Sequence, residues 1–363
     1  MSSADLTRVL SNGADRSRSE RGPALRHWLV YGAGSTGRKW AAALATDGRT
    51  VHGFIDRQAA PSGGLPVFRP GECPSELRRN CAVLIGLHNP GVDIGAVRAA
   101  LLAEGFADVW LLQDLIDAWP ERAHFWLAPA KESLPFGDDI CRAHDALADD
   151  ASRSFFVALL DQRLNGAANA LPAPDPVHPY FPLDLPAPTS PIRFIDCGAY
   201  TGDTITSFRR HGFEFGAVAA FEPDPAHFPK LGAALAGESG FAFPCGVWNA
   251  MTQLRFVADD AASHFADDGE ITVQTVALDQ ALPNFAPTLI KMDIEGAEGQ
   301  ALVGGRGLIE RYRPRLAISA YHRPRDLWEL LLQIDAWDLG YEFHLRGHSF
   351  NGFDTVLYGI PTP

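Results

Sequence analysis

The stretch that most constrains the fold is Arg193–Asp203, which reads RFIDCGAYTGD. A short apolar run ends in Asp196, Gly198 and Gly202 follow, and a pattern with helical spacing comes next. This order predicts a strand, a tight glycine loop and the start of a helix. Because glycine lacks a Cβ and tolerates positive φ, the loop lets backbone approach a ligand closely. Ligands of open α/β sheets bind beyond the carboxyl ends of the strands, so we expect this loop to form the floor of a binding crevice.

The next predicted strand also ends in an acid. Residues 217–221 are apolar, and Glu222 stands 20 residues after Gly202. An acid there can accept hydrogen bonds from both hydroxyls of a ribose. The spacing GxxxG differs from the GxGxxG that packs a pyrophosphate against a helix N-terminus, which indicates a nucleoside ligand without a pyrophosphate, such as S-adenosylmethionine (SAM). Another nucleotide, or an ordinary α/β connection with a chance acid, is the alternative.

Length and charge bound the class of protein. A chain of 363 residues with a hydrophobic fraction of 46% is typical of a soluble globular protein with two domains. The net charge of −13 argues against broad binding to nucleic acid or anionic membranes, because nothing across the sequence would neutralise phosphates. No apolar run approaches the ~20 residues that a membrane span needs.

The cysteines and the first residues indicate the compartment. The five cysteines are scattered and form neither a disulfide framework nor a zinc cluster, which fits a reducing, cytoplasmic location. Residues 1–23 are polar and lack the apolar core of a signal peptide, so we predict a disordered tail.

A second strand–loop–helix pattern lies in a predicted Rossmann-like domain over residues 24–130. A strand at 27–31 precedes GAGSTG, and a strand at 51–55 ends in an acid. The motif predicts a nucleotide or nucleotide-sugar site at Gly32, Gly34, Gly37 and Asp56. A scaffold that only packs against the other domain or a second subunit is the alternative. Further strands at 82–87 and 108–112 would give a sheet of some four strands.

This region also loosely resembles a known family. Residues 30–34 read VYGAG, residues 53–56 read GFID, and residues 64–67 read GLPV. They are similar to the sugar-binding N-terminal domain of sugar O-acyltransferases, which implies a sugar-nucleotide ligand.

Residues 131–190 are predicted to connect the two domains. Residues 138–165 have helical spacing. Residues 171–191 are so rich in proline that they can be neither a helix nor a central strand, and we expect an extended passage over the second domain. Residues 178–181, HPYF, would lie near the mouth of the crevice, where Tyr180 could contact the acceptor; packing against the sheet edge is the alternative.

Residues 191–363 continue as alternating strands and helices. Strands are expected at 241–245, 289–293 and 316–320, with an inserted hairpin at 254–278 and two late strands at 341–345 and 354–360. The prediction is a mostly parallel α/β sheet closed by a late antiparallel strand.

Four segments carry a resemblance that covers nearly all of this domain. They are FIDCGAYTGDT at 194–204, AFEPDP at 220–225, VQTVALD at 273–279 and IKMDIEGAE at 290–298. The domain resembles the FkbM-type SAM-dependent methyltransferases, which implies a class I methyltransferase fold and methylation of hydroxyls of sugars and natural products. Carried over by position, the cofactor site would comprise Asp196, Gly198, Ala199, Tyr200, Thr201, Gly202, Glu222 and Pro223, and the acceptor side Asp293, Glu295 and Glu298.

A hydroxyl acceptor must lose its proton during methyl transfer. Asp293, at the end of a predicted strand, is the first candidate base, and positioning of a ligand is its alternative role. His322, at the end of the next strand and with an ordinary pKa near the working pH, is the second candidate, against a purely structural histidine. Asp293, Glu295 and Glu298 could also hold Mg²⁺, but the dipole of the helix that follows accounts for acids in its first turn, and we expect no metal.

The sequence therefore predicts a SAM-dependent O-methyltransferase with a carbohydrate or natural-product acceptor, either a small molecule or a glycan. An NAD(P)-linked oxidoreductase or a nucleotide-sugar binding protein that uses the Gly32–Gly37 loop is the alternative, and a non-enzymatic module with a relic fold is another. We expect no nucleic-acid partner and no membrane span, and a homodimer is compatible with the sequence.

Overall fold

The computed structural model of the chain describes residues 3–18, 26–58, 64–167, 171–257, 264, 265, 269 and 271–362. The chain divides into two compact units. Unit 1 comprises residues 1–137, 154–174 and 349–353, and unit 2 comprises residues 138–153, 175–348 and 354–363.

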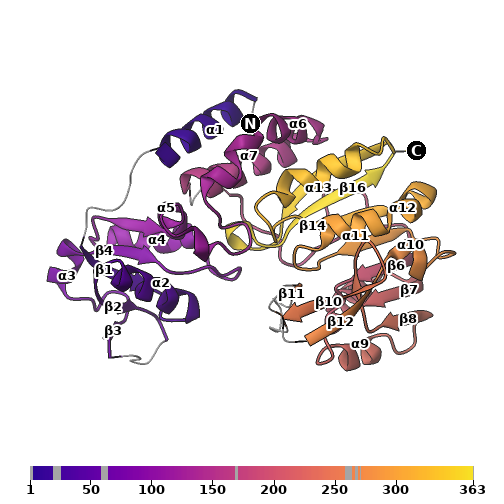
Figure 1. Cartoon of the computed structure of the whole chain (residues 1–363), viewed down its shortest axis with the longest axis horizontal. Coiled ribbons are helices and arrows are strands. Elements are labelled where there is room, and N and C mark those ends of the chain that lie inside the picture. Colours follow the sequence, from indigo (N-terminus) through magenta and orange to yellow (C-terminus); the bar gives the residue numbers. More distant parts are fainter. Residues whose placement is uncertain are drawn as a thin grey trace. The chain divides into compact units, whose positions relative to one another are not determined.

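Unit 1 is built on a parallel sheet of five strands in the order β3-β2-β1-β4-β5. The strands lie side by side in Figure 1, and their bounds are β1 (His27–Tyr31), β2 (Thr50–Ile55), β3 (Val67–Phe68), β4 (Ala82–Ile85) and β5 (Val109–Leu111). The four predicted strands are present, and β3 adds a short edge strand. The helices of this part are α2 (Ser35–Thr46), α3 (Ser75–Asn80), α4 (Ile94–Ala103) and α5 (Leu112–Leu115), with short 3₁₀ turns at Pro120–Arg122, Ala130–Glu132 and Leu134–Phe136.

The predicted disordered tail is wrong for residues 3–18, which form helix α1 (Ser3–Arg18). The segment is polar in composition, but Leu6, Val9, Leu10 and Gly13 recur on one face at helical spacing. Leu6 and Val9 are fully buried, and Gly13 packs against Leu164. Burial of this narrow apolar stripe stabilises the helix. Residues 19–23 of the predicted tail lie outside the described residues.

The predicted helical part of the connector consists of two helices. Helix α6 (Gly137–Ala146) ends where residues 147–149 interrupt the helix, and α7 (Asp150–Asn165) follows. Asp149 accepts a hydrogen bond from the amide of Ser152, at 2.6 Å, and so caps the start of α7. This cap explains why the chain restarts a helix at that residue.

Unit 2 contains a seven-stranded sheet in the order β15-β16-β14-β13-β6-β7-β8. Its strands are β6 (Ile192–Cys197), β7 (Phe215–Phe221), β8 (Gly240–Phe243), β13 (Leu289–Met292), β14 (Arg315–Ser319), β15 (Tyr341–Gly347) and β16 (Thr355–Pro361). β16 runs antiparallel to both of its neighbours, β14 and β15, and the other pairs in this sheet are parallel. The predicted parallel sheet with a late antiparallel strand is confirmed.

The central strands of this sheet are buried on both faces. Phe194, Ile195, Val218, Leu289 and Ile290 have no exposed surface, as expected for parallel strands covered by helices on both sides. The helices are α8 (Asp203–Arg210), α9 (Phe228–Ala234), α11 (Glu298–Gly304), α12 (Arg306–Tyr312) and α13 (Asp326–Asp335). Among the described helices, none has both the length and the apolar character needed to cross a membrane.

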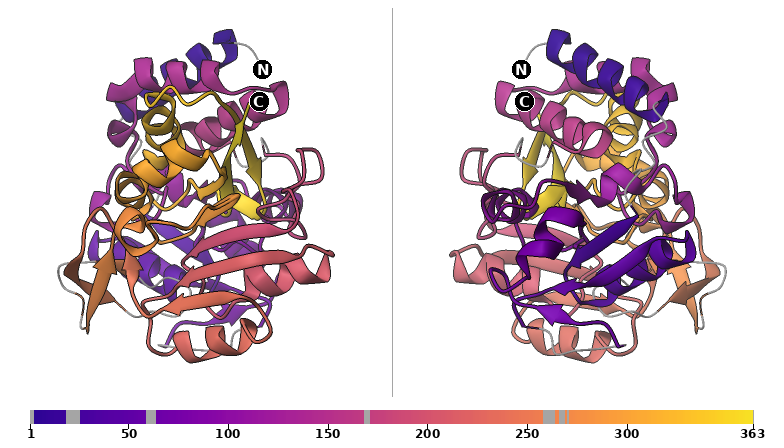
Figure 2. Two further views of the ribbon diagram at one scale, coloured as in Figure 1. Left: turned by 90° about the vertical axis from the view of Figure 1, so that its right-hand side faces the viewer. Right: turned by 90° about the vertical axis from the view of Figure 1, so that its left-hand side faces the viewer.

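A second, smaller sheet in unit 2 has the order β11-β10-β12-β9. It consists of β9 (Gly246–Val247), β10 (Thr252–Val257), β11 (His264–Phe265) and β12 (Ile271–Val276), and a short helix α10 (Leu278–Ala281) follows it. The antiparallel pair β10–β12 is the predicted hairpin, drawn in orange tones in Figure 2.

Candidate active site

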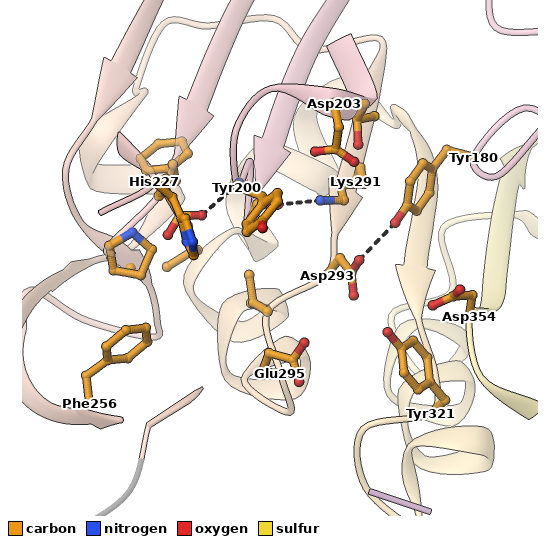
Figure 3. Close-up of a pocket in the computed structure, with 18 residues that line it drawn as sticks. Tyr180, Tyr200, Asp203, His227, Phe256, Lys291, Asp293, Glu295, Tyr321 and Asp354 are labelled. Carbon is orange, nitrogen blue, oxygen red and sulfur yellow. Dashed lines mark hydrogen bonds between the residues drawn. The ribbon is translucent and has the colours of Figure 1, made fainter. Parts of the chain in front are cut away.

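A cavity of about 320 Å³ lies at the carboxyl ends of β6, β7 and β13, inside unit 2. Tyr200, His227 and Phe256 lie toward one end of it, and Tyr180, Tyr321 and Asp354 toward the other (Figure 3). Its lining consists of Tyr180, Gly198, Tyr200, Asp203, Thr204, Phe221, Glu222, Pro223, His227, Gly246, Val247, Phe256, Lys291, Asp293, Ile294, Glu295, Tyr321 and Asp354. A cavity of this size falls in the range of small-molecule sites.

The glycine loop after β6 forms one wall of the cavity. Gly198 has a φ of +76°, and a Cβ at this residue would overlap the carbonyl oxygen of Asp293. Gly202 has a φ of +81°, and a Cβ there would overlap the side chain of Ala234. Both positions therefore require glycine, both for backbone conformation and for close packing. The loop is held against the ends of β7 and β13.

Glu222 ties the end of β7 to this loop. Its Oε2 accepts a hydrogen bond from the amide of Tyr200 at 2.7 Å, and its Oε1 accepts one from the amide of Asp224 at 2.8 Å. Burial raises the pKa of Glu222, although these two amides favour the carboxylate. A carboxylate has about four acceptor sites, so two remain for a ligand.

Lys291 anchors the glycine loop after β6 to the sheet. Its side chain is buried, with Nζ 3.1 Å from Oδ1 of Asp196, and it donates a hydrogen bond to the carbonyl oxygen of Gly198 at 2.5 Å. Burial alone would lower the pKa of Lys291, but Asp196, together with Asp293 and Asp203, outweighs burial and raises it. Lys291 is therefore a cation that links the strands to the glycine loop.

Asp293 stands at the end of β13, on the other side of the cavity. Its Oδ2 accepts a hydrogen bond from the hydroxyl of Tyr180 at 2.9 Å (Figure 3). Burial would raise the pKa of Asp293, but Lys291, His322 and the Tyr180 hydroxyl outweigh burial and lower it. Asp293 is consequently an ionised carboxylate that accepts a hydrogen bond from Tyr180.

Tyr180 belongs to the proline-rich passage and reaches the cavity as predicted from the sequence. Its φ is +73°, and its backbone amide donates a hydrogen bond to the hydroxyl of Tyr358 at 3.1 Å. The neighbouring His178 instead bonds to Asp175 at 2.9 Å and packs its ring against Phe181. Tyr180 is thus the residue of the HPYF segment that lines the cavity.

His322 lies behind Asp293 and is surrounded by carboxylates. Its Nδ1 is 2.8 Å from Oε1 of Glu298, and its Nε2 is 3.3 Å from Oδ1 of Asp293 and 3.6 Å from Oε1 of Glu295. Burial would lower the pKa of His322, but Glu298, Glu295 and Asp293 outweigh it and raise the pKa to about 10. His322 is therefore an imidazolium near neutral pH.

This environment corrects the predicted roles of His322 and Glu298. An imidazolium has no free lone pair, so His322 cannot act as the base that was expected from its ordinary pKa. Glu298 has no exposed surface. Its Oε1 accepts one hydrogen bond from the amide of Ile294 and one from Nδ1 of His322. Glu298 therefore supports His322 instead of contacting an acceptor.

The same residues form the one group in the described ranges that could hold a metal ion. Asp293, Glu298 and His322 each offer a ligand atom, and these atoms lie within 4.8 Å of one another. In this structure the positive charge within the group is that of the imidazolium. Glu298 is already engaged by His322 and by the amide of Ile294.

Residues 196–345 match the family of methyltransferase FkbM domains. These residues form a methyltransferase domain. Methyltransferase FkbM from Methylobacillus flagellatus KT has a similar fold over almost the whole length of both chains, with a TM-score of 0.76, 22% sequence identity, and coverage of 98% of this chain and 99% of that chain. This likeness confirms the predicted fold class, including the α/β fold of unit 1.

Fibrillarin from Aeropyrum pernix, solved with natively bound SAM, is a distant match. It has a TM-score of 0.29 and 12% identity, and the alignment covers 58% of this chain and 76% of that chain. This similarity is too low to support an inference. No curated protein matches the chain.

Within the methyltransferase domain, the predicted site residues fall into two groups. Gly198, Tyr200, Glu222, Pro223, Asp293, Glu295 and Tyr180 line the cavity. Asp196, Ala199, Thr201, Gly202, Glu298 and His322 do not line it. Asp196, Ala199 and Glu298 have no exposed surface and support the residues in front of them.

Sequence reasoning missed several lining residues. Tyr321 directly precedes the predicted His322, so the end of that strand was a usable signal. Asp354 directly precedes β16, and Phe256 lies on β10 of the small sheet. No local sequence motif marks either residue. Lys291 is part of the IKMDIEGAE motif, but nothing in the sequence distinguishes its buried role.

The four predicted nucleotide-site residues of unit 1 also come together. A Cβ at Gly37 would overlap the carbonyl oxygen of Gly32, which has a φ of +98°. Oδ2 of Asp56 accepts a hydrogen bond from the amide of Ala33 at 2.7 Å. Gly34 has open space around its Cβ position and begins α2 as its N-cap. A ligand at this loop stays a prediction.

Proposed function

We propose that the methyltransferase domain transfers a methyl group from SAM to a hydroxyl of a carbohydrate or natural-product acceptor. The supporting observation is that one cavity joins the Gly198–Glu222 wall to Asp293, Glu295 and Asp354. The wall with Gly198 and Glu222 suits a nucleoside. The opposite wall, with Asp293, Glu295 and Asp354, offers carboxylates to a hydroxyl-bearing molecule, and tyrosines lie beside them.

The residues around the glycine loop fit SAM in charge and shape. Glu222 is oriented by two backbone amides and keeps acceptor sites for ribose hydroxyls. The rings of Tyr200 and His227 lie 4.3 Å apart between centroids, beside Phe256 and Val247 in the lining, and offer an apolar surface to a base. SAM carries a sulfonium and an ammonium group, and the carboxylates of Asp203 and Asp293 supply opposite charge.

The other end of the cavity fits a polyol. Asp293, Glu295 and Asp354 contribute carboxylate oxygens, which accept hydrogen bonds from hydroxyls. Tyr180 and Tyr321 add aromatic rings beside them. The acidic lining disfavours a phosphate or carboxylate next to the reacting hydroxyl, because like charges would meet in a partly buried site.

Catalysis in such a site depends mainly on placement. When bound, SAM supplies an electrophilic methyl group on a sulfonium with a good leaving group. The chain has to hold the acceptor hydroxyl in line with the bond that breaks, which can supply about 7–11 kcal/mol. It also has to take up the hydroxyl proton, a contribution of typically about 10²–10⁴-fold. A homodimer and a cytoplasmic location stay predictions from the sequence.

Calorimetric titration with SAM and S-adenosylhomocysteine tests the cofactor. We expect micromolar binding to the wild type and a loss of about 1.5–3 kcal/mol of binding free energy in Glu222→Ala, because a hydrogen-bonded charge is removed. Asp56→Ala is the matched control, because Asp56 makes the equivalent acid-to-amide bond in unit 1. No binding to the wild type, or equal loss in both variants, would contradict the proposed site.

A further inference from the structure

Glu295 is a cavity-lining carboxylate that has no hydrogen-bond donor among the described residues. The closest charged atom with which it pairs is Nε2 of His322, at 3.6 Å, and its side chain is 17% exposed. Asp293 is committed to Tyr180, and Glu222 is committed to two backbone amides. Glu295 thus differs from these two acids, each of which already accepts a hydrogen bond from the chain.

The backbone holds Glu295 in this position. Its φ is +54°, in the left-handed region that side-chain-bearing residues seldom adopt, and Gly296 follows with a φ of +92°. The amide of Ile294 donates a hydrogen bond to Oε1 of Glu298 at 2.9 Å, which anchors the loop from the buried side. Such strain concentrates at functional sites and persists because the surroundings enforce it.

The two acids at the acceptor end differ in what they can do. Asp293 accepts from Tyr180 and faces the His322 imidazolium at 3.3 Å, so its negative charge is stabilised from two sides. A carboxylate stabilised in this way is a good hydrogen-bond acceptor and a weak base. Oε1 of Glu295 stands farther from the imidazolium, at 3.6 Å, and Glu295 lines the same cavity as Asp293 and Tyr321.

We propose that Glu295 is the general base of the reaction and that Asp293 is a positioning residue for the same hydroxyl. The inference rests on the proposed function. The acceptor oxygen forms a bond to the methyl carbon while the carbon–sulfur bond breaks and its electron pair goes to sulfur. The hydroxyl proton passes to a carboxylate oxygen of Glu295, so that the products are a methyl ether, S-adenosylhomocysteine and a protonated Glu295.

The charges around Glu295 support this assignment. Burial raises its pKa to about 8, Asp293, Glu298 and Asp354 add to the rise, and His322 opposes it. Tyr321, which lies two residues beyond the end of β14, also faces this group. A base whose pKa lies near the working pH combines a useful ionised fraction with the strongest driving force for proton transfer.

The test compares Glu295→Gln, Asp293→Asn and the wild type, with Glu329→Gln as a control. Glu329 lies on α13 in an exposed pair with Arg325, away from the cavity lining. Methyl transfer from SAM to a panel of methyl glycosides is measured as kcat/KM from pH 6 to pH 9.5. S-adenosylhomocysteine binding is measured on the same samples, and the carboxyl carbons of ¹³C-labelled glutamate are titrated by NMR in the wild type and in Glu295→Gln.

We expect Glu295→Gln to lower kcat by about 10²–10⁴-fold. The rise of kcat/KM through about pH 8 and one glutamate titration in that range should disappear with it, while S-adenosylhomocysteine still binds. Asp293→Asn should keep the pH rise and raise KM, and Glu329→Gln should behave as the wild type.

The inference is overturned if Glu295→Gln keeps the pH rise or if Glu295 titrates near its ordinary value while S-adenosylhomocysteine binds; the proposed function would then stand. Failure of the wild type to bind S-adenosylhomocysteine would overturn the proposed function itself. Binding without transfer to any of the glycosides would remove the polyol acceptor on which the inference depends.

Discussion

One buried histidine influences the charge of the carboxylates around it. Glu298, Glu295 and Asp293 hold His322 as an imidazolium, and Lys291 together with His322 lowers the pKa of Asp293. The charge of Asp293 therefore depends in part on a residue that does not line the cavity. Such an arrangement also makes the pair of His322 and Glu298 sensitive, because removing one partner leaves a buried charge unpaired.

Glu298→Gln should lower the free energy of unfolding by roughly 3–5 kcal/mol near pH 6, as for other broken buried pairs. The folded pKa of His322, about 10, lies above its unfolded value of about 6.5. This stabilisation is therefore complete below about pH 6.5 and is lost as the pH rises through 10. Urea denaturation from pH 6 to pH 10 measures the effect, and the variant should show a smaller pH slope, because Glu295 and Asp293 remain.

Glu329→Gln serves as the comparison for this change, since it removes an exposed carboxylate from a pair with Arg325. Exposed pairs contribute about 0–1 kcal/mol, so its unfolding should change little. Equal losses of unfolding free energy in Glu298→Gln and Glu329→Gln would contradict the predicted contribution of the buried pair between Glu298 and His322.

Two loops at the ends of neighbouring strands build the cavity together. The loop after β6 and the loop after β13 meet where Gly198 touches the backbone of Asp293, and Lys291 donates to the carbonyl oxygen of Gly198. The wall near Glu222 and the wall near Asp293 are thus held in one arrangement. Even a single added methyl group at Gly198 should therefore weaken ligand binding, because it would push the two loops apart.

Gly198→Ala should weaken S-adenosylhomocysteine binding by at least about tenfold, which corresponds to about 1.4 kcal/mol. The added methyl group would overlap the carbonyl oxygen of Asp293, at a backbone φ of +76° that alanine disfavours. Gly232→Ala is the matched control, because nothing lies within 4 Å of its Cβ position within α9. It should bind normally and gain about 0.5–1 kcal/mol of stability. Unchanged binding in Gly198→Ala would contradict the role of this contact.

The two α/β units of the molecule use the same local design. In unit 1, Asp56 at the end of β2 accepts from the amide of Ala33, and in unit 2, Glu222 at the end of β7 accepts from the amide of Tyr200. Each acid thereby stabilises the glycine loop beside it. The acid after the second strand has a structural role in both units, so its presence alone does not identify a ligand.

The features of the fold and of the site that depend on neighbouring residues could be predicted from the sequence. Strand, glycine loop and acid follow one another along the chain, which is why Gly198, Tyr200, Glu222 and Asp293 were found to line the cavity as expected. The order of neighbours in the sequence determines such a pattern.

The remaining parts depend on long-range packing. Asp354 reaches the cavity because β16 inserts between β14 and β15, and the imidazolium of His322 depends on three carboxylates that close around it only in the folded chain. Helix α1 was missed because its polar composition hid the spacing of Leu6 and Val9.

Hydrogen exchange with and without saturating S-adenosylhomocysteine tests the central claim most directly, because one measurement reports on both glycine loops. The account predicts added protection at the amides of residues 198–202, 221–223 and 293–295, which surround the cavity, and unchanged exchange at residues 32–37. Protection at residues 32–37 without protection at residues 198–202 would contradict it.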